Sequence, residues 1–195
     1  MSQLEIALFG FPKIKLNNQL VTSDRRKAVA LLAYLAVSGK RYSRDALAGF
    51  LWPNYEQVSA YAYLRRTLWE LNQILGKGWI EADRSSLQMA TGAGCALDTA
   101  EFDALTGPNA EIDALEAAIQ LYRGDFMAGF SVADTTPFES WQNQQAGYHR
   151  RRFAGTLERL ASARATNGEH EASLLHAQRW LALDPLDEAA HRTLM

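Results

Sequence analysis

Apolar side chains occupy every second position at the start of the chain: Leu4, Ile6, Leu8, Ile14 and Leu16. Gly10, Pro12 and the pair Asn17-Asn18 interrupt this alternation. A two-residue period broken by residues of this kind is typical of short strands joined by turns. The pattern therefore predicts two or three antiparallel strands.

An uninterrupted apolar segment follows, residues 28–37 (AVALLAYLAV), and it predicts a buried helix. Ser23-Asp24 offers an N-cap, and Ser38-Gly39 is expected to end the helix. A helix that crosses a bilayer needs roughly 20 apolar residues, and this segment is much shorter. We expect a core helix and no membrane anchor.

Two more helices are predicted before residue 80. Ser43 is the expected N-cap of a short helix that runs through Phe50 and stops before Pro53. The next helix begins between Glu56 and Ser59, and Gly76 follows its last turn.

This third helix contains YAYLRRTLWELNQIL, residues 61–75, and its apolar residues share one face. With about 3.6 residues per turn, that face holds Tyr61, Leu64, Leu68, Leu71 and Leu75. The opposite side holds Ser59, Ala62, Arg66, Trp69 and Gln73, with Arg65 at one edge and Tyr63 at the other. The first face is expected to attach the helix to its core. The second is either a solvated back or a surface that contacts a partner.

The segment WIEADRSSLQM, residues 79–89, predicts a hairpin with its turn at Asp83-Arg84-Ser85. Strands, three helices and a terminal hairpin in this order describe a winged helix-turn-helix. The small, glycine-rich tract TGAGCAL, residues 91–97, marks the expected domain boundary. We assign residues 1–94 to this domain and residues 95–195 to a second one.

The second domain is expected to be all-α, with no strand beyond Asp98. Helices are predicted at residues 99–105, 110–122, 137–166, 169–183 and from 187 to the end. Residues 154–187 fit a 34-residue helix-turn-helix repeat of tetratricopeptide type. Ser173 and Trp180 stand where small alanines are usual, and Trp180 is expected to fill a gap between helices. Because the last predicted helix lacks a partner, we expect either that the chain is part of a longer protein or that another chain covers this face. The fold class is thus α+β, mainly α.

Charge divides unevenly between the two parts. Residues 1–97 carry 12 Lys or Arg against 7 Asp or Glu, whereas residues 98–195 carry 8 against 15. A basic part joined to an acidic part suggests a module that binds a polyanion, although two ordinary domains with scattered charge remain an alternative. The single cysteine, Cys95, and the lack of an export signal favour the cytoplasm.

Catalytic patterns are not found in the sequence. The four histidines include no i, i+4 pair and no neighbouring Cys, so no metal site is expected. Gly39-Lys40 and Gly76-Lys77 lack the spacing of a phosphate-binding loop, and no nucleophile elbow is present. We expect no enzyme, no cofactor and no metal in this chain.

The third helix is the expected DNA-binding element. Arginines beside small and aromatic residues suit a helix that enters a major groove, because Arg binds guanine or phosphate and Ala permits close approach. In a winged helix-turn-helix the front half of this helix lies deepest. The candidate contacts on it are Ser59, Ala62, Tyr63, Arg65 and Arg66. Trp69 and the back half are expected to be scaffold, with Trp69 packed on the hairpin or the second domain.

Accessory contacts are expected at two other places. Ser43 and Arg44 begin the second helix, where free N–H groups favour a phosphate. Arg84 at the hairpin turn is expected to reach a minor groove or flanking phosphates. The competing interpretations are a plain N-cap for Ser43 and a solvated turn residue for Arg84.

Six segments resemble one known family. They are LEIALFGFPKIKL, RRKAVALLAYLAVSGKRYSRDALAGFLWP, YLRRTLWELNQILG, LYRGDFMAGF, FESW and LALDPLDEAAHRTLM. In this order they resemble the antibiotic regulatory (SARP-type) transcriptional activators, in which an OmpR-type winged helix precedes a bacterial transcriptional activation domain. Leu64-Arg65 and Ser43-Arg44 match recurrent family motifs. Asn72 stands where the family often has arginine.

The resemblance implies promoter binding to double-stranded DNA, as a homodimer or as tandem protomers on repeats, and contact with RNA polymerase. We therefore expect a sequence-specific DNA-binding regulator that activates transcription. Two alternatives remain at this point. One is a tetratricopeptide-type adaptor whose winged helix binds protein, and the other is the N-terminal control segment of a larger signalling protein with an ATPase or cyclase.

Overall fold

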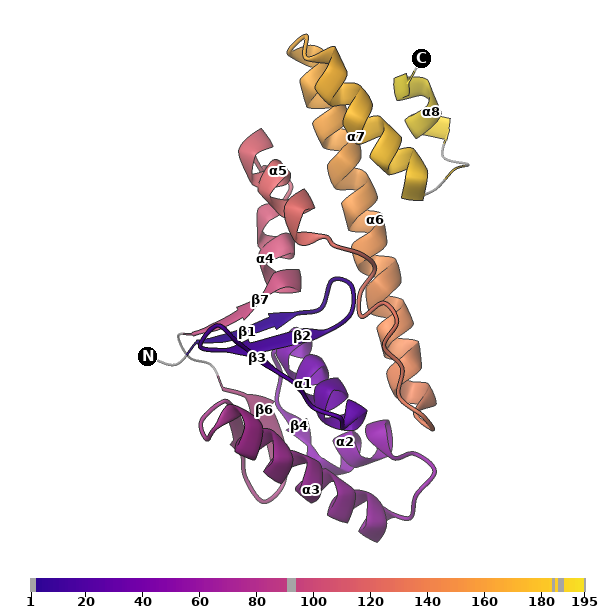
Figure 1. Cartoon of the computed structure of the whole chain (residues 1–195). Helices are drawn as coiled ribbons and strands as arrows, with labels where there is room; N and C mark the ends of the chain where they lie inside the picture. Colours follow the sequence, from indigo (N-terminus) through magenta and orange to yellow (C-terminus); the bar gives the residue numbers. More distant parts are fainter. Residues whose placement is uncertain (1–2, 91–93, 184, 186–187, 195) are drawn as a thin grey trace.

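The computed structural model describes residues 3–90, 94–183, 185 and 188–194, and Figure 1 shows their arrangement. A four-stranded sheet has the order β3-β2-β1-β7. Its strands are β1 (Leu4–Ala7), β2 (Lys13–Leu16), β3 (Gln19–Val21) and β7 (Cys95–Leu97). The predicted two or three N-terminal strands are confirmed, and there are three of them, β1 to β3. Asn17 and Asn18 have φ of 51° and 66°, the left-handed region that Asn tolerates in a tight hairpin turn.

Strand β7 was not predicted from the sequence. It pairs in parallel with β1, with Leu4 opposite Cys95 and Ile6 opposite Leu97. The segment is too short to show an alternating pattern, and its pairing depends on a partner about 90 residues away in the chain. The expected boundary tract partly overlaps residues 91–93, which lie outside the described residues.

The winged helix-turn-helix is confirmed. Three helices and a second, three-stranded sheet of order β4-β6-β5 form it. Its elements are α1 (Arg26–Ser38), β4 (Tyr42–Ser43), α2 (Arg44–Leu51), α3 (Gln57–Leu75), β5 (Ile80–Ala82) and β6 (Ser86–Met89). Gly39 ends α1 in the left-handed conformation, as expected.

Two local expectations about these helices are wrong. Helix α1 begins after Arg25, which makes no side-chain cap bond. The hydroxyl of Ser23 instead accepts a bond from the N–H of Arg25, so this serine closes the turn before the helix. Tyr61 is half-exposed and not part of the core, because it lies in the first turns of α3, where its hydroxyl reaches Asp45 (3.4 Å).

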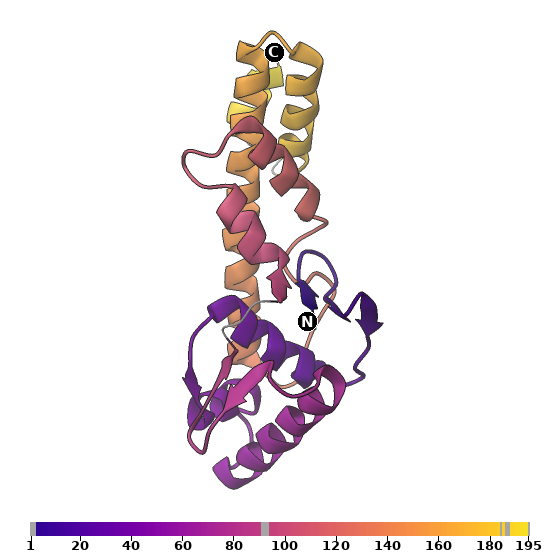
Figure 2. The same cartoon turned by 90° about the vertical axis from the view of Figure 1, so that its left-hand side faces the viewer.

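The second half is helical, and its predicted helices are confirmed to within a few residues. They are α4 (Asp98–Leu105), α5 (Ile112–Leu121), α6 (Thr136–Thr166), α7 (His170–Leu183) and α8 (Glu188–Leu194). Helix α6 has 31 residues and so a length of about 46 Å. In Figure 1 it extends from the level of α1 and α2 to that of α7 and α8, and Figure 2 shows α4 and α5 in front of its middle part.

Helices α6 and α7 pack side by side as the tetratricopeptide-like pair. The hydroxyl of Ser173 donates to the carbonyl oxygen of Ala161 (2.8 Å) across this pair. Trp180 is 4% exposed and fills the space between helices, as expected. Both bulkier residues are therefore accommodated where the repeat usually has alanine.

The two halves share their cores. Phe126, Phe130 and Phe138 pack with the buried residues of the winged helix, whereas Phe9 packs among the helices of the second half. An isolated bridge joins Phe9 to Phe126, in a part of the chain where no strand was expected. Gly124 lies beside Gly10: a Cβ atom added at Gly124 would be in van der Waals contact with the Cα of Gly10, at 3.5 Å. This contact places the segment 123–130 against the turn that follows β1.

The described residues contain no helix that is long and apolar enough to cross a membrane. They also contain no group of three or more His, Cys, Asp or Glu placed to hold a metal ion.

Candidate nucleic-acid interface

A groove of about 880 Å³ lies between α3, the start of α2 and the tip of the β5-β6 hairpin. Eleven residues line it: Ser43, Arg44, Asp45, Val58, Tyr61, Arg65, Leu68, Trp69, Asn72, Arg84 and Ser85. Three candidate elements thus meet at one surface, although they are separated in the sequence. Four of the eight candidate residues, Ser43, Arg44, Arg65 and Arg84, lie here.

Helix α3 is held by its buried face, which fixes what the rest of the helix presents. Its buried residues are Ala60, Leu64, Thr67, Leu68, Leu71 and Leu75. The groove is lined by a neighbouring stripe, Val58, Tyr61, Arg65, Trp69 and Asn72. Residues three or four apart share one side of a helix, so this stripe runs along most of α3.

Trp69 and Asn72 therefore lie on the surface that Arg65 presents, contrary to the expectation that they are scaffold. Trp69 is 62% exposed and packs in neither core. The helical period explains the difference, since positions 65, 69 and 72 are successive neighbours on one side. Arg65 was predicted at the edge of the polar side of α3, and the groove lies along that edge.

Ser43 and Arg44 join α2 to the hairpin. The hydroxyl of Ser43 accepts a bond from the N–H of Ala46 (3.1 Å), so its N-cap role is confirmed. The backbone N–H of Arg44 donates to the carbonyl oxygen of Ser85 (2.8 Å), and its Nε donates to that of Asp83 (3.0 Å). These bonds fix the hairpin tip relative to the first turn of α2.

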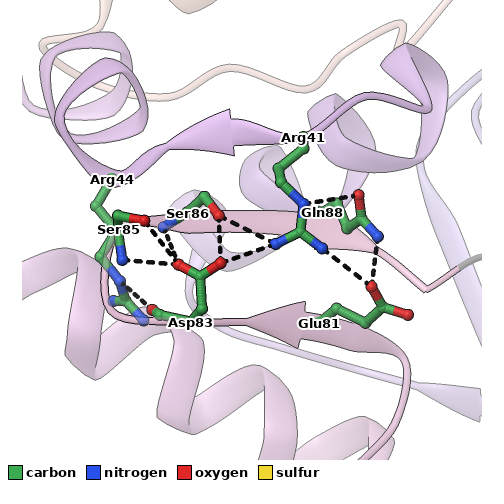
Figure 3. Close-up of polar contacts among 7 residues, drawn as sticks. All are labelled: Arg41, Arg44, Glu81, Asp83, Ser85, Ser86 and Gln88. Carbon is green, nitrogen blue, oxygen red and sulfur yellow. Dashed lines mark hydrogen bonds and ion pairs between the residues drawn. The ribbon is translucent and has the colours of Figure 1, made fainter.

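The hairpin turn is organised around the carboxylate of Asp83 (Figure 3). Its Oδ1 accepts the backbone N–H of Ser85 and of Ser86, each at 2.7 Å, and its Oδ2 accepts the Ser86 hydroxyl at 2.7 Å. The Ser86 and Ser85 hydrogen bonds hold the pKa of Asp83 well below its usual range. The turn that carries Arg84 is therefore fixed by an ionised side chain.

Arg41, the residue before β4, also stabilises this turn. Its guanidinium donates to Asp83 Oδ2 (2.9 Å) and to the Ser86 hydroxyl (3.1 Å), and it pairs with Glu81 (3.3 Å) (Figure 3). Gln88 contacts both Arg41 and Glu81. Arg41 is thus engaged within the hairpin.

Arg65 and Arg84 differ from the arginines around them. The guanidinium of neither forms a hydrogen bond or ion pair with another described residue, whereas those of Arg44 and Arg41 are bonded within the domain. Asp45 is the acidic residue of the groove lining, and it accepts bonds from Gln57 and Tyr61. The groove therefore presents two arginines whose donors are free for a ligand.

Tyr63 and Arg66 lie on another side of α3, next to the start of α1. Arg66 pairs with Glu70 (3.2 Å), which also pairs with Arg25 (3.0 Å). Tyr63 stacks on Trp52 at 6.3 Å. The geometry thus separates Arg65 from Arg66, which the sequence analysis treated as one pair.

Ser59 and Ala62 are exposed in the first turns of α3 and line no described groove. Val58, which the sequence analysis did not single out, is 80% exposed at the groove. Its position three residues before Tyr61 and seven before Arg65 is the signal that could have identified it.

Comparison with known proteins agrees with this architecture. A family model described as the bacterial transcriptional activator domain matches residues 97–195. A solved structure of EmbR from Mycobacterium tuberculosis, in complex with a low affinity phosphopeptide, superposes with a TM-score of 0.74 at 18% sequence identity. No curated protein sequence matched the chain.

The match to EmbR covers 100% of this chain and 54% of the EmbR chain, so this chain spans about half the length of that relative. At this identity the likeness shows the fold, a winged helix followed by tetratricopeptide-like helices. The family model supplies the relationship, because it covers half of the chain. The chain therefore belongs to the bacterial transcriptional activator domain family, in the SARP-type arrangement that places a winged helix-turn-helix before that domain.

Proposed function

We propose that this chain is a cytoplasmic, sequence-specific DNA-binding regulator that activates transcription. Residues 1–94 are the proposed DNA-binding domain, and residues 95–195 are the proposed activator domain that contacts RNA polymerase. The chain is proposed to bind promoter repeats as a homodimer or as tandem protomers. Membership of a family of transcriptional activators supports this assignment.

One observation carries the DNA-binding proposal: Arg65 of α3 and Arg84 of the hairpin line one groove with their donors free. The major groove of DNA is about 12 Å wide and admits an α-helix. With α3 in that groove, Arg65 is placed to donate to a guanine or a phosphate. Arg84, which lies beside α3, is then placed to contact the flanking DNA backbone or the minor groove.

Other groove residues support the same assignment. The methyl groups of Val58 are exposed and suit the methyl group of thymine. The hydroxyl of Ser43 and the first turn of α2 favour a phosphate, although Asp45 lowers the local positive charge. Arg66, Tyr63, Ser59 and Ala62 are proposed to contact flanking phosphates at most, since they lie outside the groove.

The test uses genomic fragments retained by the purified chain, with affinity measured by fluorescence anisotropy. Affinity is expected to fall steeply with salt, with a logarithmic slope of about −0.9 for each phosphate contacted. Arg65→Ala and Arg84→Ala are each expected to weaken binding by about tenfold. Arg192→Ala in α8 is the matched control, because it is also exposed and unpaired among the described residues.

Failure to retain any genomic fragment, or binding without salt dependence, contradicts the DNA-binding proposal and favours a protein-binding adaptor. Unchanged affinity in the Arg65→Ala, Arg84→Ala double variant contradicts the assignment of the groove as the DNA-binding surface. Activation is tested separately by transcription from a retained fragment with purified RNA polymerase. The chain is expected to increase transcript yield, and an unchanged or reduced yield contradicts the activator assignment.

A further inference from the structure

A second cavity, of about 570 Å³, lies where the winged helix meets the helical half. Helix α1, residue 40 and β4 contribute one wall, and β7, α4 and α6 contribute the other. Small-molecule sites typically have volumes of about 300–1,000 Å³ and occur preferentially at domain interfaces. The cavity is separate from the DNA groove, with which it shares no lining residue.

Aromatic rings from both halves line this cleft. Tyr34 of α1 lies edge-on to Trp141 of α6, with ring centroids 5.1 Å apart, and Tyr34 also contacts Tyr42 at 4.8 Å. Tyr148 of α6 lines the same cleft and is 39% exposed. These partly exposed rings offer surfaces on which a flat ligand can pack.

The free charges in the cleft are positive. Lys40 and Arg151 line it, and their charged groups form no hydrogen bond or ion pair with another described residue. Asp103 also lines the cleft, but it is paired with Arg152 (3.0 Å) and bonded by the Tyr148 hydroxyl (3.3 Å). A ligand carboxylate would therefore meet two unpaired cations and an acid that is already neutralised.

Gly147, one turn before Arg151 on α6, has no side chain and leaves space for the Arg151 guanidinium. A Cβ atom at Gly147 would lie 3.4 Å from Nη1 of Arg151, so the guanidinium lies over the preceding turn of the helix. Gln144 and Gln145 of the same region line the cleft, and their amides are also without partners among the described residues. Amide and guanidinium donors of α6 thus line the cleft without partners among the described residues.

His149 is a second, independent indication of a ligand. It lines the cleft and is 1% exposed, and within the described part of the chain neither of its ring nitrogens has a hydrogen-bond partner. Its Nδ1 lies 3.9 Å from Asp103, too far for a hydrogen bond. Buried polar atoms are nearly always bonded to protein, water or ligand, so this unpaired ring indicates a site that is completed by another molecule.

From this geometry we infer that the cleft between the two halves binds a small aromatic carboxylate. The carboxylate binds Lys40 and Arg151, the ring packs against the aromatic side chains that line the cleft, and a polar group of the ligand or an accompanying water reaches His149. Because both halves contribute to the cleft, a bound molecule contacts the DNA-binding and the activator regions together. The inference does not depend on DNA binding, and its test contains no DNA.

The test titrates the full chain with 4-hydroxybenzoate and with indole-3-acetate, followed by nuclear magnetic resonance. Saturable binding at or below about 1 mM is expected, with shifts at the Trp141 indole N–H and the Gln144 and Gln145 side-chain amides. The neutral analogues 4-hydroxybenzamide and indole-3-acetamide are expected to bind at least about tenfold more weakly.

Two variants locate the site. Lys40→Gln with Arg151→Gln removes the cations from exposed positions and is expected to weaken binding by about tenfold or more. Ala100→Trp, at an exposed position of α4 that lines the cleft, fills it without removing charge and is expected to abolish binding. The control is Lys77→Gln with Arg192→Gln, which removes two exposed cations outside the cleft and is expected to bind normally.

Absence of saturable binding by both carboxylates overturns the inference. So does equal affinity for the acids and their amides, or an equal loss in the control variant. Normal binding by the Ala100→Trp chain would show that the carboxylate binds elsewhere, and that result overturns the inference as well.

Discussion

Arg65 and Arg66 are adjacent in the sequence but lie in different surroundings. Arg65 lines the groove without a partner, whereas Arg66 pairs with Glu70 on another side of α3. We expect Arg65→Ala to weaken DNA binding by about tenfold and Arg66→Ala by less than about threefold. Anisotropy titrations of both variants on one retained fragment measure this. Equal losses would show that both arginines contact DNA.

Asp83 shows how one side chain fixes a turn. Because its hydrogen bonds lower its pKa in the folded state, its ionised form stabilises the fold at pH values above 3.8, the ordinary value. That contribution is lost as the pH falls from 3.8 through the lowered pKa. We expect Asp83→Asn to reduce the melting temperature near neutral pH, and the difference from the unmodified chain to shrink in acid.

Thermal unfolding followed by circular dichroism from neutral pH to below 3.8 measures this difference. Asp24→Asn is the control, since Asp24 is exposed and forms no hydrogen bond or ion pair with another described residue. If the difference in melting temperature between the Asp83→Asn and unmodified chains stays constant into acid, the ionised form of Asp83 is not what stabilises the turn.

At the scale of elements, Asp98 joins the first strand to the helical half. This side chain at the start of α4 accepts the backbone N–H of Leu8 (2.8 Å) and of Phe9 (3.1 Å) just after β1, and it pairs with Arg123 (2.8 Å). Its side chain is 7% exposed. Removal of the carboxylate leaves two N–H groups without an acceptor in a buried place.

We therefore expect Asp98→Ala to lower the free energy of unfolding by about 2–4 kcal/mol, since a buried donor without a partner costs about 1–3 kcal/mol. Urea denaturation measures the loss. Glu101→Ala, at an exposed position of the same helix, is expected to change stability by less than about 0.5 kcal/mol. A similar effect of both variants would show that Asp98 contributes only helix propensity.

At the scale of the whole molecule, helix α6 connects the two halves. Its N-terminal part enters the core of the winged helix, where Phe138 is fully buried and contacts Phe50 (6.0 Å) and Trp141 (5.5 Å) between ring centroids. Its C-terminal part packs against α7. The shared cores predict that both halves unfold in one cooperative transition.

Phe138→Ala is expected to lower the free energy of unfolding by about 3–5 kcal/mol, because a large buried ring is replaced by a cavity. Urea unfolding monitored by circular dichroism and by tryptophan fluorescence should give coincident curves. Leu175→Ala, at a 67% exposed position of α7, is the apolar control. Two separate transitions in the unmodified chain would contradict a shared core.

Local patterns in the sequence were sufficient for most elements. The alternation of Leu4, Ile6 and Leu8 and the apolar stripe of α3 depend on neighbours within a few residues, and both elements are confirmed. The glycine after α1 and the serine before α2 have the expected capping roles. Helix and strand periods are local properties, so the sequence alone determined the helices, the N-terminal strands, the hairpin and the fold class.

The tertiary structure decided which side chains share a surface. Strand β7 forms because it pairs with β1, and the groove beside α3 forms because the hairpin tip is bonded to the start of α2. Periodicity placed Arg65 at the edge of a polar side, but only the position of the hairpin made that edge the groove and assigned Arg66 to another face. Such contacts depend on long-range packing, whose partners no local pattern specifies.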